Sequence, residues 1–154
     1  TSGTDMTHLR PSLLVLLLAT MLVALPTGCA PQPSLKQQLN TARDTASKQL
    51  PLPYRDGLSV ESALVEDDTL VLLIRNPEGE AAKVREHPRY GELVQGEQDA
   101  MQELCAWPAL RPLHGSEARI VRRFVDRNGG LFFETSLPAK ACSTTTADPQ
   151  GPAQ

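Results

Sequence analysis

Apolar residues recur at a helical period in the segment that follows residue 33. Four of them stand at intervals of 4, 3 and 4: Leu35, Leu39, Ala42 and Ala46. That spacing is typical of an amphipathic helix, and Ser34 is a residue type that caps helix N-termini, so we expect a helix over residues 34–49. Residues 51–57 end it, because two prolines exclude helix and Asp56-Gly57 favours a turn.

A period of two replaces the helical period further along and predicts strands. Residues 58–65 alternate apolar and polar positions, residues 69–74 are largely apolar on both faces, and an acidic triplet lies between them. This pattern predicts a β-hairpin whose second strand is central in its sheet. Residues 117–126 and 131–137 form a second predicted hairpin, because Asn128-Gly129 accepts the positive φ angles of a tight turn.

Between the two hairpins, six apolar residues have spacings that suit one helical face: Leu93, Val94, Ala100, Met101, Leu104 and Cys105. We therefore expect a helix over residues 92–105, in which Gly96 costs about 1 kcal/mol relative to alanine. A proline-rich connection follows over residues 107–116. The element order is α-β-β-α-β-β, and the predicted fold class is α+β, with an antiparallel four-stranded sheet packed by helices.

The first 28 residues have the order of regions found in a signal peptide. A short polar stretch with Arg10 follows Met6, and 13 apolar or nearly apolar residues (13–25) come next. At a rise of about 1.5 Å per residue they span about 20 Å, less than the roughly 30 Å hydrocarbon core of a membrane. We therefore expect an export signal in this segment, and we expect neither it nor the five residues before Met6 to belong to the folded domain.

The end of this signal, "LPTGCAP" (residues 25–31), resembles the lipobox of bacterial lipoproteins. The resemblance implies that Cys29 becomes the first mature residue and carries acyl chains such as palmitate, with Pro26 where the class usually has leucine. Ala30 after the cysteine implies sorting to the outer membrane. An ordinary secretory signal with a cysteine near its cleavage site is the alternative. The predicted organisation is a signal over 1–28, a lipidated tether over 29–33, one domain over 34–142 and a disordered tail over 143–154.

Two cysteines are left if Cys29 is acylated. Cys105 and Cys142 are 37 positions apart in a chain predicted to reach an oxidising compartment. We predict that they pair, which would stabilise the domain by roughly 4 kcal/mol in the chain-entropy model. A metal site or a nucleophilic cysteine is the alternative, but C-x-x-C spacing is absent from the sequence and no histidine lies within a few residues of either one.

Charge and candidate chemistry narrow the function classes. The net charge of −3 argues against nucleic acid as a partner, because a phosphate backbone requires a basic surplus. His87 and His114 lie in predicted loops without a partner at ligand spacing, and Ser116 lacks the G-x-S-x-G context of a nucleophile. We therefore predict a protein that is not an enzyme and needs no cofactor or metal.

Two charged clusters remain. Glu66, Asp67 and Asp68 could bind calcium, but adjacent acids in a tight turn cannot all face one ion, so a solvated turn is the favoured interpretation. The second cluster is basic and consists of Arg119, Arg122, Arg123 and Arg127. Strand alternation places Arg119 and Arg123 on one face and Arg122 on the other. This cluster is interpreted as a solvated strand edge, with contact to anionic lipid or an acidic partner as the alternative. Trp107 is expected to pack over the disulfide.

The succession of lipobox, helix, hairpin, helix ending in cysteine, and second hairpin with a closing cysteine resembles small secretin pilotins. The type it resembles is the beta-class (AspS-like) pilotin of type II secretion systems, with matches at Cys105, Gly115, Asp126, Gly129 and Cys142. The resemblance implies a lipid-anchored assembly factor on the periplasmic face of the outer membrane, with the C-terminal segment of a secretin as partner. A periplasmic module that binds a small ligand or inhibits an enzyme is the alternative.

Overall fold

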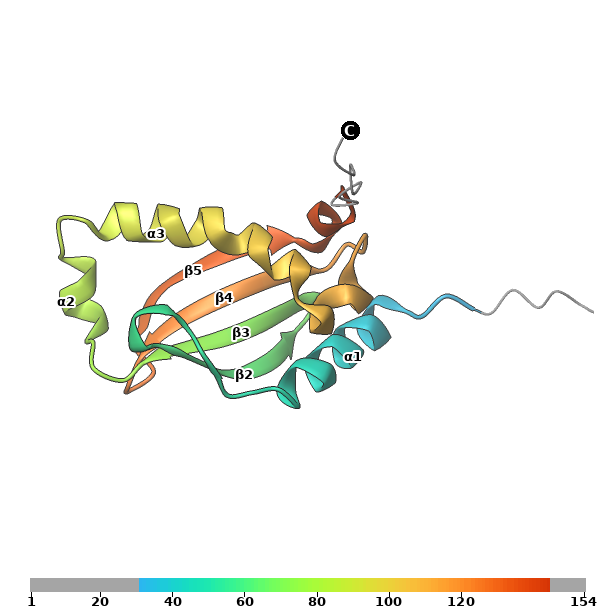
Figure 1. Cartoon of the computed structure of the whole chain (residues 1–154), viewed down its shortest axis with the longest axis horizontal. Coiled ribbons are helices and arrows are strands. Elements are labelled where there is room, and N and C mark those ends of the chain that lie inside the picture. Colours follow the sequence, from blue (N-terminus) through green and yellow to red (C-terminus); the bar gives the residue numbers. More distant parts are fainter. Residues whose placement is uncertain (1–30, 145–154) are drawn as a thin grey trace, which may run out of the picture. The chain divides into compact units, whose positions relative to one another are not determined.

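The computed structural model describes residues 31–144. Within this range one sheet has the order β1-β2-β3-β4-β5, and Figure 1 shows β2 to β5 side by side. Its strands are β1 (Leu52–Pro53), β2 (Ser59–Glu66), β3 (Thr69–Asn76), β4 (Arg119–Asp126) and β5 (Leu131–Pro138). The helical elements are α1 (Leu35–Ser47), α2 (Ala81–Arg85), α3 (Tyr90–Asp99) and the 3₁₀ segments η1 (Arg55–Gly57), η2 (Ala100–Ala106), η3 (Pro108–Leu113) and η4 (Ala139–Thr144).

The sheet is mixed, which corrects the prediction of four antiparallel strands. Both predicted hairpins form, β2 with β3 and β4 with β5, and β3 is central as expected. However, β3 and β4 run parallel, with Thr69 opposite Arg119. Parallel neighbours need a crossover of a dozen or more residues, and the segment that contains α2, α3, η2 and η3 supplies it. The fifth strand, β1, pairs antiparallel with β2 and has two residues, too few to produce a period in the sequence.

The first helix is confirmed, and its start has a complete capping box. The Ser34 hydroxyl accepts from the Gln37 amide at 3.3 Å, and the Ser34 amide donates to the Gln37 side chain at 2.8 Å. These bonds satisfy two backbone groups that a helix N-terminus otherwise leaves unpaired. The helix buries Leu39, Ala42 and Ala46, three of the four residues that predicted it.

The predicted helix over 92–105 is divided in the structure. It begins as α3 at Tyr90 and continues after Asp99 as the 3₁₀ segment η2. In a 3₁₀ segment residues three apart share a side, so Met101 and Leu104 both point into the core, where they are buried. The helix α2 was not predicted, because five residues are too few to establish a helical period.

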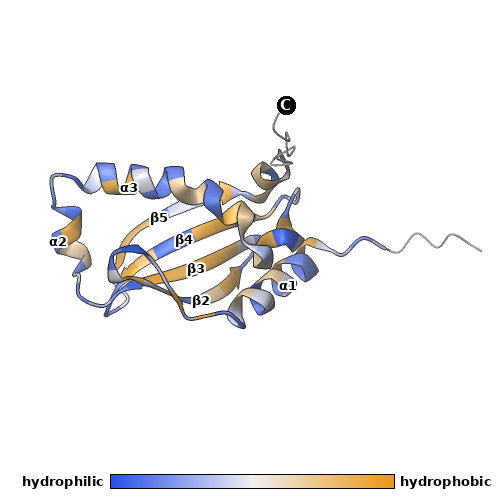
Figure 2. Cartoon of the chain, viewed as in Figure 1, coloured by the Kyte–Doolittle hydropathy of each residue, from blue (hydrophilic) through white to orange (hydrophobic). Residues whose placement is uncertain are grey.

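The helical elements pack on one face of the sheet. In β3, Leu70, Leu72 and Ile74 alternate with residues of the opposite face, and all three are buried. Leu70 and Leu72 belong to a core cluster with α1, η2 and η3, whereas Ile74 belongs to a second cluster with α2 and α3. Figure 2 shows β3 as apolar along most of its length, and much of the visible side of α1 as polar. The core therefore lies between this face of the sheet and the helices.

The arginines of β4 lie on two faces, as alternation predicts, but β4 is an interior strand and not a solvated edge. Arg122 is buried on the helical face. Arg123 lies on the opposite face, where it bonds Glu66 through two nitrogens at 2.7 and 2.9 Å and also contacts Glu134. The hydrogen bonds from Arg123 hold the pKa of Glu66 below its usual value. The basic residues therefore do not form one patch.

The outer edge of β5 is covered by side chains of α3. Gln98 donates to the Ser136 carbonyl at 2.9 Å and accepts from the Ser136 amide at 3.1 Å. The Tyr90 hydroxyl donates to the Phe132 carbonyl at 2.9 Å. These bonds satisfy backbone groups that an edge strand otherwise leaves unpaired.

A disulfide joins Cys105 to Cys142, the pair named from the sequence, with their Cα atoms 5.1 Å apart. It connects η2 to η4 near the end of the described chain. Trp107 packs against the core cluster that contains Cys142. Its indole nitrogen donates to the Gln49 side chain at 2.9 Å. The tryptophan therefore helps to join η2 and η3 to the end of α1.

Candidate functional site

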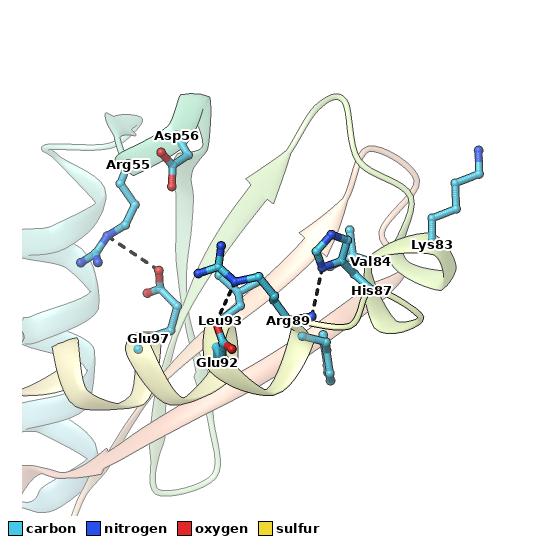
Figure 3. Close-up of a pocket in the computed structure, with 11 residues that line it drawn as sticks. Arg55, Asp56, Lys83, Val84, His87, Arg89, Glu92, Leu93 and Glu97 are labelled. Atoms are coloured by element: carbon cyan, nitrogen blue, oxygen red, sulfur yellow. Dashed lines mark hydrogen bonds and ion pairs between the residues drawn. The ribbon is translucent and has the colours of Figure 1, made fainter.

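A groove of about 580 Å³ opens between α2, α3 and residues 54–58, which we call the strap (Figure 3). The groove is lined by Arg55, Asp56, Lys83, Val84, His87, Arg89, Tyr90, Glu92, Leu93, Gly96 and Glu97. Charged groups stand along its rim, and several are already paired: Arg89 bonds Glu92 at 2.7 Å, and Lys83 bonds Glu80 at 3.0 Å. The rim is therefore polar without a strong excess of either sign.

The groove deepens into an apolar pocket of about 220 Å³, with which it shares several lining residues. Phe124, Phe132 and Phe133 line this phenylalanine pocket, together with Leu58 and Val84. Phe124 and Phe133 stack with centroids 4.5 Å apart, and Tyr90 meets Phe133 edge to face at 6.1 Å. A pocket of this kind, with aromatic walls and a polar rim, is suited to holding one large apolar side chain.

A bulge in the β4–β5 pairing explains why consecutive phenylalanines contribute to one pocket. Phe133 lies opposite Phe124, whereas Leu131 lies opposite Val125, so Phe132 is the extra residue. Side chains of a regular strand alternate between faces, and a bulge redirects one of them. Phe132 and Phe133 therefore both pack in the cluster that α2 and α3 cover.

The strap is held against α3 by a buried polar network. The Tyr54 hydroxyl donates to a Glu97 carboxylate oxygen at 2.5 Å, and Arg122 Nη1 lies 3.8 Å from the same oxygen. The side chains of Glu97 and Arg122 are each only 6% exposed. The guanidinium of Arg122 also lies 5.3 Å from the centre of the Tyr54 ring, and that of Arg55 lies 5.2 Å from it. The network fixes the strap, so the groove is formed without a ligand.

Burial and this hydrogen bond keep Tyr54 protonated. Desolvation, followed by the bond to the Glu97 carboxylate, raises the pKa of Tyr54 to about 12. The ring also packs edge to face on Phe124, with centroids 6.0 Å apart. Tyr54 therefore joins the polar network to the aromatic wall of the pocket, and it does so as a hydrogen-bond donor at physiological pH.

The other wall of the groove, α2, is attached to the β4–β5 turn through Asp126. This carboxylate accepts from the amides of Ala81 at 3.2 Å, Asn128 at 2.8 Å and Gly130 at 2.7 Å. The bonds from the Ala81 and Gly130 amides, in that order of importance, hold the pKa of Asp126 below its usual value. Gly130 is required for this contact, since a Cβ there would lie 2.5 Å from the carboxylate. Asp126 thus positions α2.

The variant Asp126→Asn is expected to lower the melting temperature at pH 7 by roughly 5–10 °C, because an amide nitrogen that cannot accept replaces one of the two accepting oxygens and the negative charge is lost. A carboxylate whose folded pKa is depressed stabilises the fold above its unfolded pKa of about 4, and this contribution is lost as the pH falls through the lower folded value. Melting curves at pH 7 and pH 3 should therefore show a difference from the unmodified protein that narrows in acid. Asp68 is an exposed aspartate, so Asp68→Asn is the control and should change neither melting curve. An equal loss at both pH values would contradict this role.

The structure places the sequence-predicted candidates in separate locations. His87 lies at the groove, where its Nδ1 accepts from the Arg89 amide at 3.1 Å. His114 lies at the end of η3 with a buried Nε2, and the Ser116 hydroxyl accepts from the Ala118 amide at 3.2 Å. Over residues 31–144 no three potential ligands gather as a metal site. The acidic triplet and the arginines of β4 lie outside the groove.

The buried pair that holds the strap, Glu97 and Arg122, was not identified from the sequence. Glu97 is one of several polar positions on the predicted helix, and Arg122 was assigned to the basic cluster, yet they meet under the strap. The one available signal was the interruption of the apolar face of β4 by Arg122, between Ile120 and Phe124, because an arginine there must find a buried counter-charge.

Cys29, the predicted lipid attachment site, lies outside the described residues. In the range 31–144 no helix has the length and apolar character that a membrane span requires. The predicted tether (29–33) and tail (143–154) each extend beyond this range. They remain predictions.

Comparisons with known proteins identify similar folds. No protein-family model matches the sequence, and neither does any curated protein. A predicted secreted protein of Pseudomonas aeruginosa has a similar structure, with a TM-score of 0.52 and 15% identity over 70% of this chain and 92% of the other. The pilotin EpsS of the Vibrio vulnificus type 2 secretion system has a TM-score of 0.47 and 15% identity over 70% of this chain and 93% of its own. The first similarity shows that this chain shares its α+β fold with the Pseudomonas protein.

Proposed function

We propose that this protein is an outer-membrane lipoprotein that acts as a pilotin-like assembly factor. It binds the C-terminal segment of a secretin subunit and escorts that subunit to the outer membrane by means of the lipid on Cys29. Several acyl chains on one residue exceed the two signals that stable membrane attachment requires. The sequence resemblance to pilotins suggested this role.

The observation that carries the proposal is the preformed groove with its phenylalanine pocket. An amphipathic peptide helix needs an apolar trough for one face and polar groups along the rim for the other. The groove offers both, with an aromatic pocket between strap, α2 and α3 and charged residues at its mouth. Because Tyr54 and Glu97 already fix the strap, the strap itself loses little conformational entropy when a peptide binds.

Co-purification from the native bacterium tests the role. The secretin should co-purify with both the unmodified protein and Cys29→Ser, since the groove does not include the anchor. Secretin multimers should reach the outer-membrane fraction only with the unmodified protein. Failure to recover the secretin with either form would refute the proposal, whereas correct localisation with Cys29→Ser would refute only the part played by the anchor.

Mass spectrometry of the mature N-terminus tests the lipid itself. We expect Cys29 as the first residue, with a mass increase equal to a diacylglycerol on sulfur and an acyl group on nitrogen. An unmodified N-terminus at any other residue would establish an ordinary secretory signal.

A further inference from the structure

Gly96 stands in the middle of α3 without a structural reason inside the described domain. A Cβ built at this position would meet nothing within 4 Å, so no neighbouring atom requires a glycine. Glycine inside a helix lowers its stability relative to alanine. The helix therefore carries a destabilising residue at a place where the fold would accept a side chain.

The position of Gly96 supplies a reason outside the domain. Gly96 lines the groove together with Leu93, one turn earlier on the same face of α3. Leu93 is 44% exposed, one of the few large apolar side chains left open in the described residues. At the groove, α3 thus presents an exposed apolar side chain, Leu93 (Figure 3), followed one turn later by a position without a side chain.

Helices pack with their axes about 8 to 10 Å apart, and the shortest distances occur where a small residue stands at the crossing point. Any side chain at position 96 would hold a second helix away from α3. With glycine there, a bound helix can approach closely enough for a large side chain of its own to enter the phenylalanine pocket, which begins beside Leu93.

An exposed carboxylate at the groove indicates which charge a bound helix would carry. Asp56, on the strap side of the groove, is exposed, and among the described residues its carboxylate forms no hydrogen bond or ion pair. It has a positive φ of 54°, which aspartate and asparagine tolerate better than most residues. A basic side chain on the bound helix would pair with this carboxylate across the rim.

We propose that the partner is an amphipathic helix that crosses α3 at Gly96, inserts one large apolar side chain into the phenylalanine pocket and directs a basic residue toward Asp56. This proposal rests on the proposed function, because the helix it describes belongs to the secretin segment. Gly96 is then the residue that determines which helices fit. Helices with a bulky residue at the crossing point are excluded.

Binding of a labelled peptide with the sequence of the C-terminal segment of the organism's own secretin tests this inference. The mature chain with Cys29→Ser is compared with the same chain carrying Gly96→Leu or Gly91→Leu. Gly91 is a matched control, because it lies on the same helix, has equally open space where a Cβ would stand and does not line the groove. Gly96→Leu should raise Kd about tenfold or more, and Gly91→Leu should change it by less than about twofold.

Thermal melts separate binding from folding. Both leucine variants should melt at the same temperature as the parent or a few degrees higher, because leucine favours helix over glycine.

Asp56→Asn keeps the positive φ and removes the charge, so it should weaken binding about threefold at low salt, and the difference should disappear at high salt.

The outcomes separate the two proposals. If the parent binds and Gly96→Leu binds equally well, the crossing at Gly96 is overturned and the pilotin role stands. If Asp56→Asn binds as the parent does at every salt concentration, the basic residue of the partner is overturned. If the parent itself does not bind the secretin peptide, the proposed function fails and the inference fails with it.

Discussion

Glu97→Ala is expected to lower the free energy of unfolding by about 3 to 5 kcal/mol, because it leaves the buried guanidinium of Arg122 without a counter-charge. It also removes the acceptor of the Tyr54 hydroxyl, so one substitution breaks the contacts that hold the strap. A domain of this size is typically stable by about 5 to 15 kcal/mol. Urea denaturation should show the loss as an earlier midpoint.

Glu103→Ala is the matched control for this variant. Arg55 pairs with Glu97 at 3.7 Å and with Glu103 at 3.4 Å. The side chain of Glu103 is 68% exposed, and exposed ion pairs contribute about 0 to 1 kcal/mol. In Glu97→Ala, hydrogen exchange should speed up at the Leu58 amide, which bonds the Arg55 carbonyl at 3.2 Å within the strap. If both variants unfold at the same urea concentration, the strap is not held by Glu97.

Loss of the disulfide is expected to have an effect of similar size. The bond closes a loop of 37 residues, and the chain-entropy model assigns roughly 4 kcal/mol to such a loop. Cys105→Ala combined with Cys142→Ala should lower the urea midpoint by the corresponding amount. The bond ties η2 to η4, so the end of the chain should become accessible to proteases first.

A reductant provides the control for the disulfide. The unmodified protein in dithiothreitol should unfold at the midpoint of the double variant, and the double variant should not respond to dithiothreitol. An unchanged midpoint for the reduced protein would show that the bond does not stabilise the fold.

Local elements could be predicted from this sequence, whereas the direction of β4 could not. Alternating residues and the Asn128-Gly129 turn are local signals, and they identified the β2–β3 and β4–β5 hairpins. The relative direction of β3 and β4 depends on where a connection of some forty residues ends. No period within either strand encodes that direction, so the antiparallel prediction was wrong.

The groove could not be predicted from the sequence either, because it too depends on the path of the connection between β3 and β4. Its parts come from the strap, from α2 and α3, and from the bulge at Phe132, which the crossover brings together. Gly96 was recognised as a weak point in a helix, but its place at the groove depends on the path of the crossover. Glu97, its neighbour, gave no signal at all, because a buried glutamate and an exposed one have the same spacing on a helix.

The bonds between α3 and the edge of β5 have a consequence for the behaviour of the protein at high concentration. An uncovered edge strand can serve as a template on which the strand of another molecule adds, which is the first step toward fibrous aggregates. Gln98 and Tyr90 occupy backbone groups of β5 that such a strand would use. The helix α3, which lines the groove, therefore also protects the edge of β5 from self-association. Any event that detaches α3 would leave the chain prone to precipitate.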